Sequence, residues 1–220
     1  MASQMPSTKD LEKLIGELNS KARRDIQEGA VTESYKADKE QIIGLLNRAL
    51  ASEWTAFMQY WHHYFMATDI HSAEIKEYFK EAAGQELHHI DEIGSRIQLL
   101  GGVPVAKPAE VPQLWPPTVE YGHDLVSMLE VDLVAERTTI GFYSEIVRLA
   151  GNDDITTRGL FEEILREEED HANDLADLIY AMDASTNQPI DTLHEEAVEA
   201  AGQTGSQSTG TAGHQHRRAA

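Results

Sequence analysis

The 220-residue chain contains no cysteine. This absence excludes a disulfide-stabilised scaffold, a zinc–thiolate site, a cysteine nucleophile and an iron–sulfur cluster held by thiolates. No apolar run approaches the ~18 residues that a membrane span needs, and the polar start, Met1 to Lys13, lacks the apolar core of a signal peptide. We therefore expect a soluble, cytoplasmic protein that does not bind membranes.

Basic residues are scarce. The chain has 18 Lys and Arg against 38 Asp and Glu, which gives a formal net charge of −20. Because contact with nucleic-acid phosphates needs clustered basic side chains, DNA binding is not expected. The acidic excess falls mainly within residues 41–183, where the carboxylates either form a solvated face or hold cations.

Apolar residues recur at helical spacing in four long stretches, at about Lys39–Thr68, Ser72–Leu100, Tyr121–Ala150 and Asp154–Asp183. No strand-like alternation of useful length occurs, so the predicted class is all-α. The segment Gly101–Tyr121 holds five of the seven prolines and predicts no regular element. It is long enough to run the whole length of a helix, which predicts a four-helix bundle with one long crossover.

The pattern predicts three regions. Residues 1–37 form an N-terminal extension with an amphipathic helix, which begins at a Ser7 capping box and ends before Gly29. Residues 38–183 form the bundle. Residues 184–220 form an acidic and then Gly- and Ser-rich tail, which we expect to be largely disordered.

Six charged or polar residues interrupt the apolar stripes of the four helices. They are Glu53, Glu86, His89, Glu136, Glu168 and His171. A buried carboxylate is costly unless it is paired or bound to a cation, and six such residues are hard to explain as isolated core polar groups. Their number therefore points to bound metal.

The spacing of these residues brings them to one height. Glu53 and Glu86 lie equally far from the turn that joins their helices, and Glu136 and Glu168 do the same in the second pair. Each second helix carries Glu-x-x-His, which places both side chains on one face. Hard carboxylates with one imidazole per metal suit two iron or manganese ions, and this ligand set is typical of ferritin-like dimetal bundles. Glu86 and Glu168 are the predicted bridges.

Over residues 40–183 the chain resembles the bacterioferritin branch of the ferritin-like superfamily. The phrases that carry the resemblance are Ala51-Ser52-Glu53, Glu86-Leu87-His88-His89, Met128-Leu129-Glu130-Val131-Asp132-Leu133-Val134-Ala135-Glu136 and Ile164-Leu165-Arg166-Glu167-Glu168-Glu169-Asp170-His171. The resemblance implies a ferroxidase centre within each subunit, which oxidises Fe(II) with dioxygen or peroxide, and a hollow shell that stores ferric mineral. It implies two Fe ions per subunit, with Mn or Zn as alternative occupants. Tyr60 matches a tyrosine that the family keeps beside the centre.

Two departures from that family qualify the expectation. Leu87 stands where bacterioferritins have the methionine that holds haem between subunits, so haem is not expected. The tail replaces the pore-lining fifth helix of 24-subunit shells, and the added N-terminal helix looks like that of 12-subunit miniferritins. Both features favour 12 subunits over 24. Miniferritin-like proteins with a bacterioferritin-type site usually add a pair of cysteines, which this chain lacks.

Two other functions remain open: a dimanganese catalase that disproportionates peroxide, and a miniferritin-type shell that shields DNA.

The sequence leaves two interpretations open for Asp132, for the pair His62 and His63, and for a second apolar stripe on the first long helix. Asp132 either accepts the ring N–H of a ligand histidine or lies on the bundle flank. His62 and His63 are packing or inner-surface residues. A second apolar stripe favours a subunit contact over core; it comprises Trp54, Met58, Trp61 and Phe65.

Overall fold

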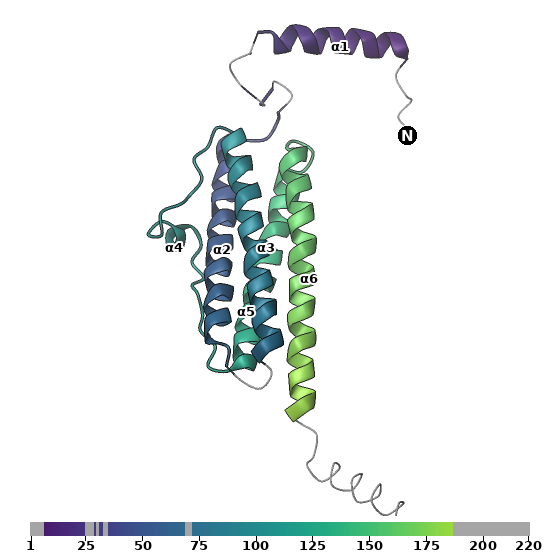
Figure 1. Cartoon of the computed structure of the whole chain (residues 1–220). Helices are drawn as coiled ribbons and strands as arrows, with labels where there is room; N and C mark the ends of the chain where they lie inside the picture. Colours follow the sequence, from purple (N-terminus) through teal and green to yellow (C-terminus); the bar gives the residue numbers. More distant parts are fainter. Residues whose placement is uncertain (1–6, 25–28, 30, 33–34, 69–71, 187–220) are drawn as a thin grey trace, which may run out of the picture. The chain divides into compact units, whose positions relative to one another are not determined.

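The computed structural model describes residues 7–24, 29, 31–32, 35–68 and 72–186, and within them the protein has helices and no strand (Figure 1). The helices are α1 (Thr8–Ala22), α2 (Lys39–Met66), α3 (Ser72–Leu99), α4 (Val111–Leu114), α5 (Leu125–Ala150) and α6 (Ile155–Thr186). The all-α prediction is therefore confirmed. Among the helices within the described ranges, none combines the length and apolar character needed to cross a membrane.

Capping residues explain where the helices begin, and they correct the predicted boundaries. The Ser7 capping box is present, but α1 ends at Ala22 rather than near Gly29. The third long helix begins at Leu125 rather than Tyr121, because Asp124 caps it and exchanges hydrogen bonds with Ser127. The predicted disorder of the tail concerns residues that, from 187 onward, lie outside the described ranges.

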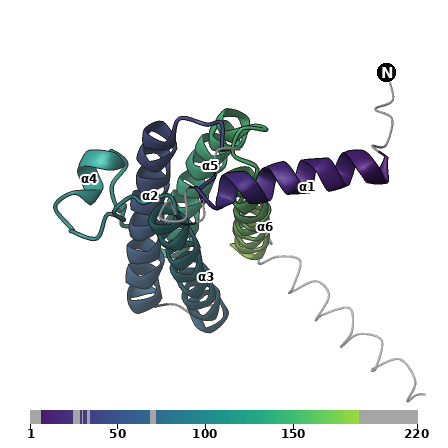
Figure 2. The same cartoon turned by 90° about the horizontal axis from the view of Figure 1, so that it is seen from above.

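The connection between α3 and α5 runs along α2, as a long crossover requires (Figures 1 and 2). Its first part is fixed by Val105 N–H, which donates to Asn47 Oδ1 at 2.7 Å. Its last part is fixed by Glu120 N–H, which donates to Gln59 Oε1 at 2.8 Å. The helix α5 therefore starts beside the end of α2 and runs back along it. The crossover is not wholly irregular, because it contains the single turn α4.

The core contains one apolar face of α2, on which Leu46, Leu50 and Tyr60 are buried. Trp61, which belongs to the second apolar stripe of this helix, is 37% exposed. The Trp61 ring stacks on the rings of Phe57 and Tyr64 of the same helix, with ring centroids 6.1 and 5.2 Å apart, respectively. Two polar residues of α2, Gln59 and His63, occupy the buried positions instead because they have hydrogen-bond partners there.

A clasp fixes the end of α3 against the start of α6. Arg96 donates to Asp154 Oδ1 at 2.7 Å and to Thr157 Oγ1 at 2.9 Å. The same Asp154 oxygen accepts the Thr157 N–H, which caps α6. The clasp thus joins the end of α3 to the start of α6, the two helices that carry Glu86 and Glu168.

Candidate metal centre

The four long helices bring all six predicted metal ligands together in the interior of the bundle. Their ligand atoms form two overlapping groups, in each of which all atoms lie within 4.8 Å of one another. The first group consists of Glu53, Glu86, His89 and Glu168, and the second of Glu86, Glu136, Glu168 and His171. Glu86 and Glu168 belong to both groups, and all six residues are buried.

The two imidazoles present the same nitrogen to the centre. His89 Nδ1 lies 3.4 Å from carboxylate oxygens of Glu53 and Glu168, and 3.6 Å from Glu86. His171 Nδ1 lies 3.3 Å from Glu168, 3.6 Å from Glu86 and 3.8 Å from Glu136. The ring centroids are 6.4 Å apart. Each Nδ1 therefore faces three carboxylates, two of which it shares with the other ring.

The outer nitrogen of each ring is held by the opposite helix. His89 Nε2 lies 2.9 Å from Glu167 Oε2, and His171 Nε2 lies 2.7 Å from Gln85 Oε1. Such partners fix the tautomer and the orientation of a metal-ligating ring. Neither Glu167 nor Gln85 was predicted from the sequence, although each stands immediately before the glutamate of a Glu-x-x-His pair.

Two tyrosines reach the centre from the remaining helices. The Tyr60 hydroxyl donates to Glu136, and the Tyr143 hydroxyl donates to Glu53. Tyr143, which the sequence analysis also missed, follows Glu136 at the same spacing at which Tyr60 follows Glu53, so the near-repeat of the two helix pairs was the available signal. Burial and the adjacent carboxylate raise the pKa of both phenols well above the ordinary value, which keeps them protonated as donors.

Electrostatics show why the cluster needs a cation. Burial, together with the charges of neighbouring carboxylates, raises the pKa of Glu86, Glu136 and Glu168. Burial also opposes the ionisation of Glu53, but the adjacent Glu86 carboxyl and the His89 and Tyr143 side chains outweigh it and lower its pKa. Among the described residues, both Glu86 oxygens and one Glu168 oxygen have no hydrogen-bond partner. Unpartnered buried carboxylates with two imidazoles are a donor set that fits two divalent metals.

Asp132 follows neither predicted reading. It is buried, and its partners are His63 Nδ1 at 2.9 Å and Gln59 Nε2 at 2.8 Å rather than a histidine of the cluster. His63 Nε2 in turn lies 3.1 Å from the carbonyl oxygen of Glu120. Asp132 thus anchors the crossover to α2 and α5, and His63 is a packing residue. Its neighbour His62 lies against the Tyr121 ring, with centroids 4.1 Å apart.

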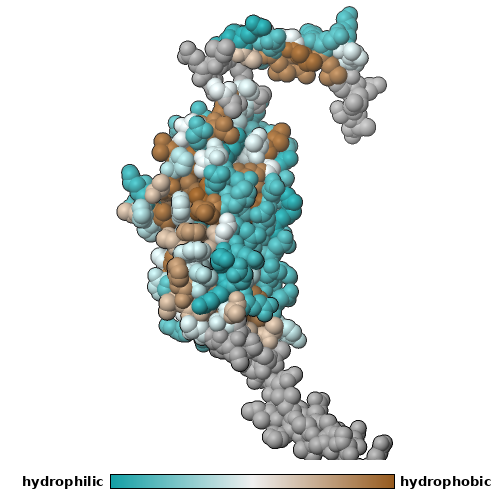
Figure 3. Space-filling view, in the orientation of Figure 1, coloured by the Kyte–Doolittle hydropathy of each residue, from teal (hydrophilic) through white to brown (hydrophobic). Residues whose placement is uncertain are grey.

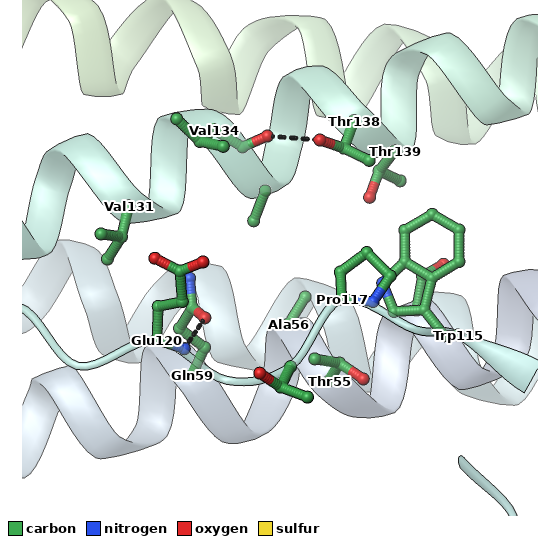
Figure 4. A pocket seen from close by; sticks show the side chains of 13 residues that line it. Thr55, Ala56, Gln59, Trp115, Pro117, Glu120, Val131, Val134, Thr138 and Thr139 are labelled. Carbon is green, nitrogen blue, oxygen red and sulfur yellow. Dashed lines mark hydrogen bonds between the residues drawn. The ribbon is translucent and has the colours of Figure 1, made fainter. Parts of the chain in front are cut away.

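Two hollows flank the centre. A cavity of about 60 Å³ lies between α2, α5 and the crossover (Figure 4), and one of its lining residues, Ser52, is 3.0 Å from the Tyr143 hydroxyl. A larger hollow of about 580 Å³ opens between α3 and α6, where Gln85, Glu167 and His171 line it. The second hollow therefore gives solvent the more direct approach to the cluster.

The comparisons with known proteins agree with this fold. Residues 43–184 match the ferritin-like domain model, so the chain belongs to the ferritin-like family. Within that family, the bacterioferritin of Rhodobacter capsulatus is 30% identical over 162 residues, which cover 73% of this chain and 96% of the relative. Its solved structure, described as having a metal-free dinuclear site and haem iron, has a TM-score of 0.60. The resemblance to bacterioferritins is thus confirmed.

Two further relatives are similar to this chain. The dodecameric thioferritin of Bacteroides fragilis, described as bacterioferritin-related, is 35% identical with a TM-score of 0.65 and covers 70% of this chain and 94% of its own. A nutrient stress-induced DNA-binding protein of a Synechococcus species is 33% identical over 139 residues, which are 62% of this chain and 79% of the relative.

Proposed function

We propose that the protein is an iron-storage and detoxification protein that oxidises Fe(II) at a dinuclear centre within each subunit. The observation that carries the proposal is the pair of overlapping ligand groups, each with three carboxylates and one imidazole nitrogen. In the two shared glutamates, both oxygens of Glu86 and one oxygen of Glu168 have no hydrogen-bond partner. Glu53, Glu86, His89, Glu136, Glu168 and His171 hold the two ions, with Glu86 and Glu168 as bridges. Dioxygen or peroxide accepts the electrons; with peroxide, two Fe(II) and two protons yield two Fe(III) and two waters.

The surrounding residues prepare this centre for divalent ions. Glu86, Glu136 and Glu168, whose pKa values are raised in the metal-free protein, would release protons as the ions bind, whereas Glu53, whose pKa is lowered, is ionised beforehand. Tyr60 and Tyr143 donate to the two unshared glutamates and hold them in place. Glu167 and Gln85 hold the rings with Nδ1 toward the metals.

Storage of mineral requires a closed homo-oligomer, and we propose a shell of 12 subunits. The dodecameric thioferritin supports that size. A subunit contact is supported by the exposed apolar side chains of α2, namely Met58, Trp61 and Phe65. The side of the bundle along α6 is hydrophilic (Figure 3) and acidic, which suits an inner surface that attracts Fe(II).

The direct test is aerobic addition of Fe(II) to purified, metal-free protein. We expect rapid formation of the ferric absorption band, an electron-dense core, and a particle mass of 12 chains by light scattering. Oxidation no faster than in buffer would refute the ferroxidase function. Purification with tightly bound manganese, together with catalase activity and no mineral, would favour the dimanganese alternative.

We expect the absence of haem to distinguish this chain from its Rhodobacter relative, whose structure is described as containing haem iron. Leu87 occupies the position of the haem-ligating methionine and cannot coordinate iron; its side chain is 49% exposed. Protein expressed with excess haem is therefore expected to show no Soret band. Haem at one molecule per two subunits would contradict this expectation and direct attention to Met58 or Met128.

A DNA-shielding shell is the second candidate, because the Synechococcus relative is named as DNA-binding. The net charge of −20 opposes it. We expect no mobility shift of duplex DNA by the assembled protein at physiological salt. A shift that weakens steeply with added salt would show phosphate contacts and would favour the shielding function.

A further inference from the structure

The centre has a near-twofold symmetry that is broken at the residues that hold the two histidine rings. Glu53 corresponds to Glu136, and Tyr143, which donates to the first, corresponds to Tyr60, which donates to the second. The two helices with Glu-x-x-His, α3 and α6, also correspond. In each of them, the residue before the glutamate is hydrogen-bonded to the histidine ring of the other helix. That residue is Glu167 on one side and Gln85 on the other.

We infer that this difference makes the two metal positions unequal, so that the His89 position takes the first divalent cation and the His171 position the second. The inference rests on the proposed dimetal function and adds an order of filling to it. Glu167 and Gln85 are the positioning residues that set this order.

The chemical reason lies in the group that accepts the hydrogen bond from Nε2 of each histidine ring. A carboxylate that accepts the Nε2–H of His89 makes its Nδ1 a stronger donor to a cation, and it adds a negative charge beside that position. The amide oxygen of Gln85 fixes the orientation of His171 but brings no charge. The other ligands are of the same kind at both positions, because each position has one unshared glutamate with a tyrosine donor and two shared glutamates.

Solvent access to the two metal positions also favours tighter retention of the cation at His89 than at His171. His89 is fully buried, whereas His171 is slightly exposed and lines the hollow of about 580 Å³ between α3 and α6. A cation at His171 is therefore the easier one to exchange. Because the Glu167 side chain is 42% exposed, water screens part of its effect. We expect a difference of about tenfold in affinity, at the low end of the range for hydrogen-bond partners of metal ligands.

Co(II) can test the order of filling, because its visible absorption reports its ligands and its anomalous scattering reports its position. The full-length, metal-free protein is titrated by absorption and calorimetry, and crystals with limiting Co(II) are measured at the cobalt edge. For the wild type we expect two steps about tenfold apart and more cobalt at His89. Glu167→Gln should make the two positions equal by weakening the first, and Gln85→Glu should make them equal by strengthening the second.

Glu169→Gln is the matched control, because it removes the same charge from an exposed position on α6 next to the cluster. It should leave the difference between the steps unchanged. Equal filling in the wild type, filling of His171 first, or a ratio unaffected by both Glu167→Gln and Gln85→Glu would overturn the inference while leaving the dimetal function intact. Cobalt at neither position would refute both. Since the two substitutions act in opposite directions, loss of fold in one leaves the other as an independent test.

Discussion

Replacing Glu168 by glutamine is expected to slow Fe(II) oxidation by about 100-fold or more. The reason is that Glu168 faces both imidazole nitrogens, at 3.4 Å from His89 Nδ1 and 3.3 Å from His171 Nδ1, and is one of two residues common to both ligand groups. An amide brings one oxygen and no charge, so it cannot bridge two cations. Even the loss of a hydrogen-bond partner of a ligand typically costs about 10–100-fold in affinity or activity, and a bridge should cost more.

Stopped-flow absorption of the ferric product measures this effect, and metal content per subunit should fall in parallel. Glu169→Gln, one residue further along α6 and exposed, should oxidise Fe(II) at the wild-type rate. Helical content and particle mass of the two variants should match. If Glu168→Gln loses less than about tenfold in rate, which is less than the loss expected for a mere hydrogen-bond partner of a ligand, the assigned bridge is wrong.

The sequence alone predicts the helices and the six clustered residues because these signals are local or simply periodic. A glutamate on an apolar stripe is conspicuous, and the rise of a helix converts its position into a height. The ends of the helices are less predictable. The true start of α5 depends on Asp124, whose capping role emerges only when Ser127 returns its hydrogen bond.

The residues that escaped prediction are those whose role depends on a neighbour from another helix. Tyr143 on an apolar stripe looks like an ordinary core residue, and its hydroxyl partner is 90 positions away. Gln85 and Glu167 look like flank residues until the register of α3 against α6 is known. Asp132 was the clearest error, because its partner His63 is 69 residues away and on a helix that the spacing argument did not pair with it.

Removing a metal-binding carboxylate should also stabilise the metal-free protein. Burial and the charges of Glu168 and Glu53 raise the pKa of Glu86 in the folded state. A group whose pKa is raised by folding stabilises the fold at pH below its unfolded pKa, about 4.3 for glutamate, and this contribution is lost as the pH rises through the folded pKa. Glu136 and Glu168 shift in the same direction, whereas Glu53 shifts in the opposite one. The free energy of unfolding should therefore fall as the pH rises from about 5 to about 8.

Glu86→Gln removes one of these ionisations and keeps the shape of the side chain. In metal-free protein at about pH 7.5 we expect it to raise the free energy of unfolding by about 1–2 kcal/mol, the size typical of one stabilising substitution, and to flatten the pH dependence. Thermal unfolding at one protein concentration measures both effects, with exposed Glu169→Gln as the neutral control. Added Co(II) at about 1,000 times its dissociation constant should reverse the order, because it stabilises the wild type by about 4 kcal/mol and the variant far less. A variant less stable than the wild type without metal would show that Glu86 is held in the bundle by interactions other than those to a cation.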